Sequence, residues 1–261
     1  MTRLNRFGWK GPETSGIARI VSAHGDYYHL VANEAETGEI LARKKKSAFL
    51  DPDAVKPITG DFVSFIYNSQ GESMITGVKP RFSHFERKDP TARRKSQTLA
   101  VNFDTLFIMM SMNENFSRAR LDRYLALAED VGEAEVKVVL TKRDLGGGEP
   151  IAGAIEISAK TGYGMDAIAP FFGQGKTIAF IGSSGVGKST LLNALAGEEW
   201  AATQEIQEWS GKGRHTTTSR ELVMLPNGAM VIDTPGIREI GLVGEAESTL
   251  IKGESTHRYR K

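Results

Sequence analysis

The sequence predicts a small all-β barrel followed by a larger α/β domain, on three observations. Short alternating runs of apolar and polar residues, separated by turn residues, fill residues 16–78 and indicate half-buried strands. Continuous apolar runs begin at residues 105–110 and are typical of a parallel sheet covered on both faces. A glycine-rich loop at residues 182–189 separates a predicted strand from a predicted helix. A chain of 261 residues has room for about two such domains.

The first domain, assigned to residues 1–82, is expected to contain five strands. They are predicted at residues 17–21, 27–31, 38–42, 61–67 and 74–78. Five short strands in so little sequence favour a closed Greek-key barrel of the oligonucleotide-binding (OB) type. Barrels of this type bind nucleic acid on one face and through two loops.

Basic residues are concentrated in the first part of the chain. Residues 1–100 contain 16 Lys and Arg against 11 Asp and Glu, whereas the remainder contains 17 against 21. The basic run at residues 43–46 either contacts RNA phosphates or forms a charged sheet edge that prevents aggregation. The local excess of positive charge favours RNA. Residues 83–100, which include a second basic run at 87–95, are predicted to be a linker. Such a basic linker is either merely solvated or, beside a nucleic-acid-binding barrel, extends the phosphate-contacting surface.

The second domain, assigned to residues 101–242, alternates strands with helices. Strands are expected at residues 105–110, 136–140, 155–157, 176–181, 219–225 and 229–232, with helices at 118–131 and 190–196. Apolar residues at helical spacing in the first of these helices are expected to pack in the core and nothing more.

The loop at residues 182–189, Gly-Ser-Ser-Gly-Val-Gly-Lys-Ser, matches the phosphate-binding loop pattern. Its glycines let phosphate oxygens approach backbone N–H groups, and the following helix adds unpaired donors and the positive end of its dipole. Lys188 is placed to reach the terminal phosphates, and the Ser189 hydroxyl to ligate Mg²⁺. An ordinary glycine-rich turn is disfavoured because the flanking strand, the flanking helix and the Lys-Ser pair all agree.

Two further segments predict recognition of guanine. A strand ends in Thr-Lys-Arg-Asp at residues 141–144, and the Asp144 carboxylate can accept both N1–H and the exocyclic N2–H₂ of guanine, donors that adenine lacks there. Thr141 stands where Asn is more usual. The next strand runs into Ser-Ala-Lys at residues 158–160, which matches a second, backbone-mediated contact. Together the segments favour GTP over ATP.

The last predicted strand delivers Asp-Thr-Pro-Gly. Asp233 is placed there to hold Mg²⁺ through water, and the Gly236 N–H to sense the γ-phosphate. A threonine from the preceding loop should supply a further Mg²⁺ ligand. We favour Thr217, with Thr216 and Thr218 as alternatives.

The predicted nucleotide site therefore has the following members. Residues expected to bind GTP are Thr141, Lys142, Asp144, Ser158, Ala159, Lys160, Gly182, Ser183, Ser184, Gly185, Val186, Gly187, Lys188, Ser189, Thr190 and Gly236. Residues expected to hold Mg²⁺ are Ser189, Thr217 and Asp233.

The order of these parts is unusual, because guanine recognition precedes the phosphate loop. An ordinary GTPase has the opposite order, and the same sheet can be built if the chain is circularly permuted. The predicted fold class is an α/β P-loop GTPase domain, circularly permuted, preceded by a small all-β OB-type barrel. The switch elements then come last in the domain, where their movement can be passed to whatever lies C-terminal.

Over about residues 4–242 the chain resembles the ribosome small-subunit-dependent GTPases of bacteria. The matching segments are residues 7–9, 59–63, 140–145, 158–162, 182–189, 213–218 and 233–239. The resemblance implies GTP hydrolysis coupled to late maturation of the small ribosomal subunit. The expected partners are that subunit and its rRNA, and the expected cofactor is Mg²⁺.

The chain departs from that family after Leu242. Members usually continue into a zinc-binding domain with three Cys and one His, whereas this chain has no Cys, so no zinc is expected. Residues 243–261 are interpreted as a short, flexible C-terminal remnant in which His257 lies at the surface. No apolar run approaches the ~18 residues of a membrane span. A cytoplasmic, monomeric protein without a membrane partner is expected.

The side chain that usually supports hydrolysis in GTPases is missing from its position in this sequence. Where ordinary GTPases carry a Gln that orients the attacking water, this chain has Ile237. His215 is predicted to orient the water and, with Lys188, to be catalytic; the alternative is that His215 contacts RNA or packs. Intrinsic turnover is expected to be slow, on the order of 10⁻⁴ to 10⁻² per second.

Two other functions fit part of this pattern. One is an RNA-binding module that uses GTP only as a conformational switch, with little hydrolysis. The other, a nucleotide or polynucleotide kinase, is disfavoured by Asp144 and by residues 158–160. Single-turnover hydrolysis with and without small subunits separates these possibilities.

Overall fold

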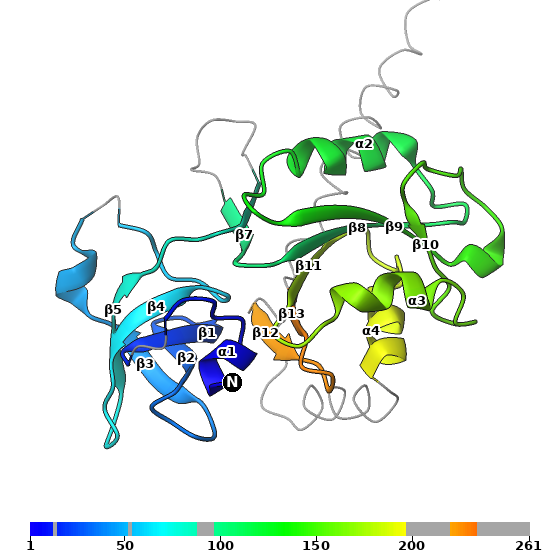
Figure 1. Cartoon of the computed structure of the whole chain (residues 1–261). Coiled ribbons are helices and arrows are strands. Elements are labelled where there is room, and N and C mark those ends of the chain that lie inside the picture. The colour runs from blue at the N-terminus through cyan, green and yellow to red at the C-terminus, as the bar shows by residue number, and fades with distance from the viewer. Residues whose placement is uncertain (13–14, 52–53, 88–96, 197–219, 234–261) are drawn as a thin grey trace, which may run out of the picture.

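The chain forms a five-stranded barrel beside a larger α/β domain (Figure 1). The structure is a computed structural model, and it describes residues 1–12, 15–51, 54–87, 97–196 and 220–233.

The barrel is closed and has the strand order of an OB-type fold. Its strands are β1 (Ile17–His24), β2 (Tyr27–Ala32), β3 (Ile40–Lys44), β4 (Phe62–Ile66) and β5 (Ser73–Val78). They follow the order β1-β2-β3-β5-β4, with β4 pairing back on β1; only β3 and β5 run parallel. Alternate residues such as Ile20, Leu30 and Ile75 fill the core. A short helix, α1 (Arg3–Arg6), contacts β2, and a 3-10 turn, η1 (Lys46–Phe49), follows β3. The five predicted strands are thus confirmed.

The α/β domain is built on a mostly parallel sheet. Its strands are β8 (Thr105–Ser111), β9 (Glu135–Thr141), β10 (Ile155–Glu156), β11 (Thr177–Ile181), β12 (Glu221–Met224) and β13 (Met230–Asp233). They follow the order β10-β9-β8-β11-β13-β12, parallel except for β12, which runs antiparallel to β13. The other edge of β12 pairs with β1 at Glu221 and Ser22, so the sheet continues into the barrel.

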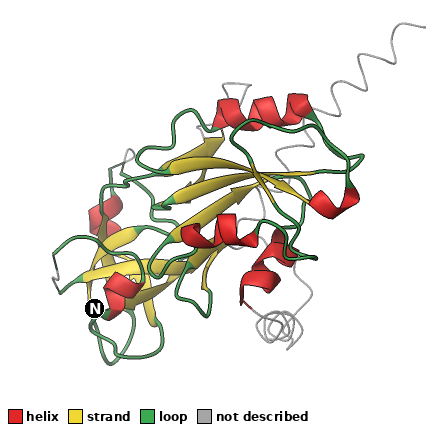
Figure 2. Cartoon of the chain, turned by 45° about the vertical axis from the view of Figure 1, so that its right-hand side comes forward, coloured by secondary structure: helices red, strands yellow, loops and turns green. Residues whose placement is uncertain are grey.

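Helices cover both faces of this sheet (Figure 2). They are α2 (Arg118–Leu127), α3 (Met165–Ile168) and α4 (Lys188–Ala196), with 3-10 turns η2 (Arg143–Leu145) and η3 (Ala169–Phe171). Strand β8 shows why its apolar run is continuous. Leu106 and Ile108 belong to the core cluster under α2, whereas Phe107 and Met109 belong to the cluster under α3 and α4. Successive side chains therefore enter opposite cores, as expected for a central parallel strand.

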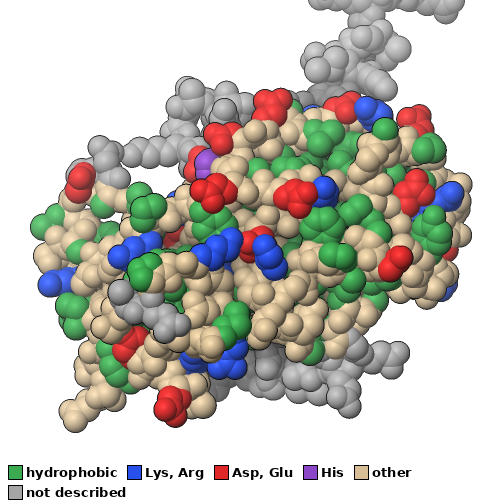
Figure 3. Space-filling model, in the orientation of Figure 1, with side chains coloured by type: hydrophobic (Ala, Val, Ile, Leu, Met, Phe, Trp, Pro, Cys, Tyr) green, Lys and Arg blue, Asp and Glu red, His purple; other side chains and the backbone are tan. Residues whose placement is uncertain are grey.

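The visible surface agrees with the uneven charge of the sequence. On the face in Figure 3, Lys and Arg side chains gather where the barrel meets the larger domain, and acidic side chains are spread over the larger domain. Among the described helices, none combines the length and apolar character needed to cross a membrane.

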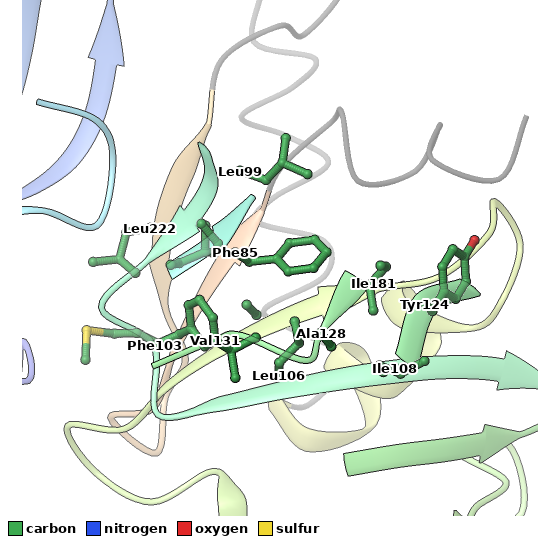
Figure 4. Packing of buried hydrophobic residues seen from close by; sticks show 14 of the residues in the cluster. Phe85, Leu99, Phe103, Leu106, Ile108, Tyr124, Ala128, Val131, Ile181 and Leu222 are labelled. Atoms are coloured by element: carbon green, nitrogen blue, oxygen red, sulfur yellow. The ribbon is translucent and has the colours of Figure 1, made fainter. Parts of the chain in front are cut away.

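The expectation of a linker at residues 83–100 was wrong for both of its flanks. Strands β6 (His84–Arg87) and β7 (Gln97–Val101) pair antiparallel, and Phe85 and Leu99 are fully buried in the core under α2 (Figure 4). The flanks carry a few apolar residues, Phe85 in β6 and Leu99, Ala100 and Val101 in β7, and burying them outweighs the basic character of the sequence between them. The basic residues 88–96 lie outside the described residues.

Candidate nucleotide site

The phosphate loop lies between β11 and α4, at the carboxyl edge of the parallel sheet. Residues 182–190 line a cavity of about 340 Å³ together with Met109, Phe180, Ile181, Lys142 and Ile232. Lys188 opens α4, and both Ser189 and Thr190 are exposed at the start of that helix. In the first turn of an α-helix, backbone N–H groups have no partner within the helix. The cavity therefore combines free donors, a lysine and a hydroxyl oxygen.

Two glycines explain why this loop can approach an anion closely. At Gly182 a Cβ would lie 3.0 Å from the Met109 carbonyl oxygen and 3.2 Å from the Val186 side chain, so no larger residue fits without displacement. At Gly187 the backbone has φ +104°, which side chains rarely allow. The loop is therefore held against β8 while its backbone faces the cavity.

The predicted guanine-reading segments line a second cavity of about 280 Å³. Its walls are Thr141, Lys142, Asp144, Leu145, Ile157, Ser158, Ala159, Lys160, Gly187 and Thr190. Lys142, Gly187 and Thr190 line both cavities, so the two adjoin. The structure brings together every predicted nucleotide-binding residue that it describes. Sequence reasoning did not assign Leu145 and Ile157 to the site, and they add apolar walls to this cavity. An apolar residue directly after Asp144, outside the predicted strands and helices, was the available signal.

Asp144 is oriented by a hydrogen bond from the other segment that was predicted to read guanine. The Ser158 hydroxyl donates to Asp144 Oδ1 at 2.7 Å, and Ser158 itself is buried. That hydrogen bond lowers the pKa of the Asp144 carboxyl, and the nearby charges of Lys160 and Lys142 act in the same direction. The side chain therefore stays ionised near neutral pH and remains a pure acceptor.

Thr141 has a role that the sequence did not predict. Its hydroxyl is buried and donates to the carbonyl oxygen of Val186 in the phosphate loop at 2.5 Å. Lys142 follows in a left-handed conformation, with φ +58°. A non-glycine residue is uncommon in that region. Thr141 thus ties the guanine-reading segment directly to the phosphate loop, and the chain turns sharply after it.

Two contacts made by Arg143 fix the loop around Asp144. The Arg143 backbone N–H donates to the Ile157 carbonyl at 3.1 Å, and the Arg143 guanidinium pairs with Glu156 at 2.8 Å. At Gly164 a Cβ would lie 2.1 Å from the Glu156 carbonyl oxygen, so the return of the second segment requires glycine. The two segments predicted to read guanine are therefore bound to each other.

The predicted Mg²⁺ ligands are only partly described. Ser189 lines the phosphate cavity. Asp233 ends β13, directly after Ile232, which lines the same cavity. His215, Thr216, Thr217, Thr218, Gly236 and Ile237 lie outside the described residues.

Comparisons with known proteins give a consistent result. A family model described as RsgA GTPase matches residues 78–243. A protein of Lactiplantibacillus plantarum named small ribosomal subunit biogenesis GTPase RsgA 2 is 39% identical over 89% of this chain and 69% of its own length. A protein of the same name from Vibrio vulnificus is 36% identical over 94% of this chain and 72% of its own. A protein of Methanosarcina acetivorans named small ribosomal subunit biogenesis GTPase RsgA is 40% identical over 74% of this chain and 55% of its own length. This chain thus spans between 55% and 72% of the length of these relatives.

Solved structures show the same fold. YjeQ from Thermotoga maritima superposes with a TM-score of 0.60 and 24% identity, over 84% of this chain and 74% of that one. YloQ, described as a circularly permuted GTPase, superposes with a TM-score of 0.56 and 21% identity, over 87% and 74%. The circularly permuted arrangement expected from the motif order is confirmed.

Proposed function

The chain belongs to the RsgA GTPase family, and on that premise we propose that it binds GTP with Mg²⁺, hydrolyses it and assists late maturation of the small ribosomal subunit. The observation that carries this proposal is the pair of adjoining cavities. One is lined by the phosphate loop and the other by the guanine-reading segments, and they meet at Lys142, Gly187 and Thr190.

Base selection is assigned to Asp144. An ionised carboxylate accepts hydrogen bonds and cannot donate them, so it suits the two N–H groups on one edge of guanine. Ser158 supports this by donating to one carboxylate oxygen and so limiting its rotation. Leu145 and Ile157 supply apolar contact for the ring.

Phosphates and Mg²⁺ are assigned to the first cavity. Lys188 and the N–H groups that begin α4 bind the phosphate oxygens, and Ser189 with Asp233 supplies oxygen ligands of the hard type that Mg²⁺ prefers. When bound, Mg²⁺ neutralises charge on the β- and γ-phosphates. Thr217 completes this assignment as the switch ligand.

Water activation is assigned to His215, since Ile237 has no side-chain hydrogen-bonding group. Changing His215 to Ala should remove most of the rate stimulated by small subunits while GTP affinity stays within a few-fold. Full stimulated activity in this variant would leave His215 without a catalytic role.

The barrel is assigned to ribosomal RNA, with the lysines after β3 as phosphate contacts. Arg43 is already engaged, because its guanidinium lies 4.1 Å from the Tyr27 ring centroid and 2.8 Å from Glu72. Lys45 and Lys46 are exposed. Replacing both with Ala should weaken binding to small subunits and reduce the salt slope by about one unit per lost contact. An unchanged slope would favour a purely protective role as a charged edge.

The function is tested by single-turnover hydrolysis of GTP and ATP, with and without purified small subunits. We expect GTP to be preferred, Mg²⁺ to be required and the subunit to accelerate turnover. GTP binding without hydrolysis under either condition would favour the switch-only RNA-binding module. Light scattering after size exclusion tests the expected monomer.

A further inference from the structure

Arg19 is a fully buried arginine that joins the barrel to the α/β domain. It belongs to β1, and only 1% of it is exposed. Its Nη1 donates to the Phe7 carbonyl at 2.5 Å and to the Thr177 hydroxyl at 3.0 Å, and contacts the Met230 sulfur at 3.7 Å. Its Nη2 donates to the Asn102 carbonyl at 2.8 Å. Three of these four partners lie in the α/β domain or directly before it.

The charge of Arg19 is supported at a distance by the carboxylates of Asp104 and Asp61, which act to raise its pKa, and by no direct ion pair among the described residues. Within that part of the chain its Nε has no hydrogen-bond partner, and burial, which is the larger effect, lowers its pKa to about 10. The guanidinium also lies 4.8 Å from the Phe62 ring centroid. A buried charge of this kind is expensive to desolvate. Apolar side chains could have filled this interface at a lower desolvation cost. The positions of the hydrogen-bond partners of Arg19 are therefore the feature that requires an explanation.

Two of the contacts of Arg19 fall on one pair of facing residues in the sheet. Thr177 is the first residue of β11, Met230 is the first residue of β13, and the two are paired across these parallel strands. At its other end β11 leads into the phosphate loop at Gly182, and β13 ends at Asp233. Arg19 thus fixes the relative position of the two strands that carry the phosphate-binding and Mg²⁺-binding parts of the site.

A second connection reaches the far end of β13. Ser22 of the barrel is paired with Glu221 of β12, and Glu221 is paired in turn with Asp233. The Thr59 hydroxyl of the barrel donates to the Arg220 carbonyl at 2.9 Å, just before β12. The barrel therefore holds β13 at its first residue through Arg19 and at its last through β12.

We propose that Arg19 is a positioning residue for GTP hydrolysis, which sets the register of β13 against β11 and thereby places Asp233 relative to the phosphate loop. This rests on the proposed function. The barrel is then part of the nucleotide site as well as a docking module. When the barrel loses its contacts with β11 and β13, Mg²⁺ binding and hydrolysis should be impaired more than binding of the nucleotide itself.

The test compares Arg19→Met with Arg19→Lys in the full chain. Arg19→Met removes every donor but keeps an unbranched apolar side chain, whereas Arg19→Lys retains a charge that can reach one or two of the partners. GDP affinity in EDTA, the Mg²⁺ concentration at half-maximal GTP affinity and the single-turnover rate at saturating GTP are measured. We expect Arg19→Met to raise the Mg²⁺ midpoint and lower the rate by about tenfold or more, because displacements of ~1 Å in a site cost up to about a hundredfold. GDP affinity in EDTA should stay close to that of the wild type, and Arg19→Lys should recover part of the rate.

Arg3→Met is the matched control. Arg3 is also a barrel arginine that donates to two backbone carbonyls, those of Ala35 and Gly38, but both lie within the barrel. This variant should keep the wild-type Mg²⁺ midpoint and rate within about twofold, as expected for a substitution away from the site.

Urea unfolding shows whether each variant is folded, and so separates a positioning role of Arg19 from a purely structural one. A folded Arg19→Met protein with the Mg²⁺ midpoint and rate of the wild type would overturn the proposal, as would GDP affinity and rate falling together in proportion. If Arg19→Met does not fold, Thr177→Val decides, since it removes one acceptor in nearly the same volume; wild-type values in that variant would overturn the proposal. A wild-type protein that neither binds nor hydrolyses GTP contradicts the proposed function instead.

Discussion

The nucleotide cavities and the junction between barrel and sheet use polar residues in opposite ways. At the junction, Arg19, Asp61 and Asn102 are almost completely buried and bonded to other protein groups. Around the cavities, Asp144 and Ser189 are exposed and face space that a ligand can fill. Buried, satisfied polar groups fix a geometry, whereas exposed donors and acceptors are available for binding.

Asn102 illustrates how a buried residue of the junction is hydrogen-bonded. Its Oδ1 accepts from the Phe82 N–H, its Nδ2 donates to the Gly60 carbonyl and its own carbonyl accepts from Arg19. Its backbone lies in the left-handed region, with φ +52°, which Asn tolerates better than most residues. Substitutions at the junction other than at Arg19 should therefore affect mainly folding, and substitutions at the cavities mainly binding.

The largest expected effect is on binding, at Asp144. Asp144→Asn places an N–H₂ group where guanine needs an acceptor, and each lost charged hydrogen bond should cost roughly 1.5–3 kcal/mol. GTP affinity should fall strongly, and xanthosine triphosphate should become the better ligand. Because Asp144 is exposed, the urea midpoint should not change. Titration with both nucleotides measures this, and equal GTP binding by the variant would refute the assignment.

The largest expected effect on stability is at Arg81. Its guanidinium donates to both oxygens of the buried Asp61 carboxylate, at 2.8 Å each. Arg81→Met leaves that carboxylate buried without its partner, which should lower the free energy of unfolding by about 3–5 kcal/mol. Urea unfolding measures the loss, and the double change with Asp61→Asn should restore part of it. A loss below about 1 kcal/mol would show that the pair is solvated.

Thr141 combines the two kinds of residue compared above, because it is buried and hydrogen-bonded but lies inside the nucleotide site. Thr141→Val leaves the Val186 carbonyl without its donor, which should cost about 1–3 kcal/mol. The loss should appear in both GTP affinity and stability, while Thr141→Ser, which keeps the hydroxyl, should lose less. Calorimetric binding and thermal unfolding together check this; an effect on stability alone would confine Thr141 to a structural role.

The smallest expected effect concerns Asp104 and pH. Burial raises the pKa of this carboxyl, but hydrogen bonds from Lys10 and from the Thr177 N–H outweigh it, and the net pKa is lowered. A lowered folded-state pKa contributes stability above the unfolded pKa of about 4, and this is lost as pH falls through the folded value. Asp104→Asn should lower stability by about 1 kcal/mol at pH 7 and lose less than the wild type on acidification. The free energy of unfolding of both proteins is measured at pH 7 and pH 3. An identical loss of stability between these pH values in both proteins would contradict a lowered pKa of Asp104.

The sequence was most informative where one physical signal dominated. The run at residues 105–110 predicted β8 because a strand buried on both faces must be apolar throughout. The glycine loop predicted the phosphate cavity because few other residues allow its backbone. By contrast, β6 and β7 were missed because each is short, with few apolar residues, and adjoins a basic run.

Arg19 and Thr141 show what pattern alone could not supply. The alternation of side chains along a strand places Arg19, between the core residues Ala18 and Ile20, on the outside of the barrel, and that is where it lies. Its burial comes from the neighbouring domain, which the alternation does not encode. The Thr141 hydroxyl likewise finds its acceptor 45 positions along the chain, at Val186. Such contacts depend on how distant segments meet in space.

The strand order β10-β9-β8-β11-β13-β12-β1 also has a consequence for synthesis on the ribosome. The barrel strands and then β8, β9 and β10 leave the exit tunnel first, and domains generally begin to fold in that order. Until β11 and β13 emerge, one edge of β8 stays open and the barrel has no sheet to join. Because β13 is the last of these strands to be translated and inserts between β11 and β12, its arrival closes the sheet and completes the attachment of the barrel. The nascent chain can therefore acquire a finished phosphate pocket only when its two halves are joined.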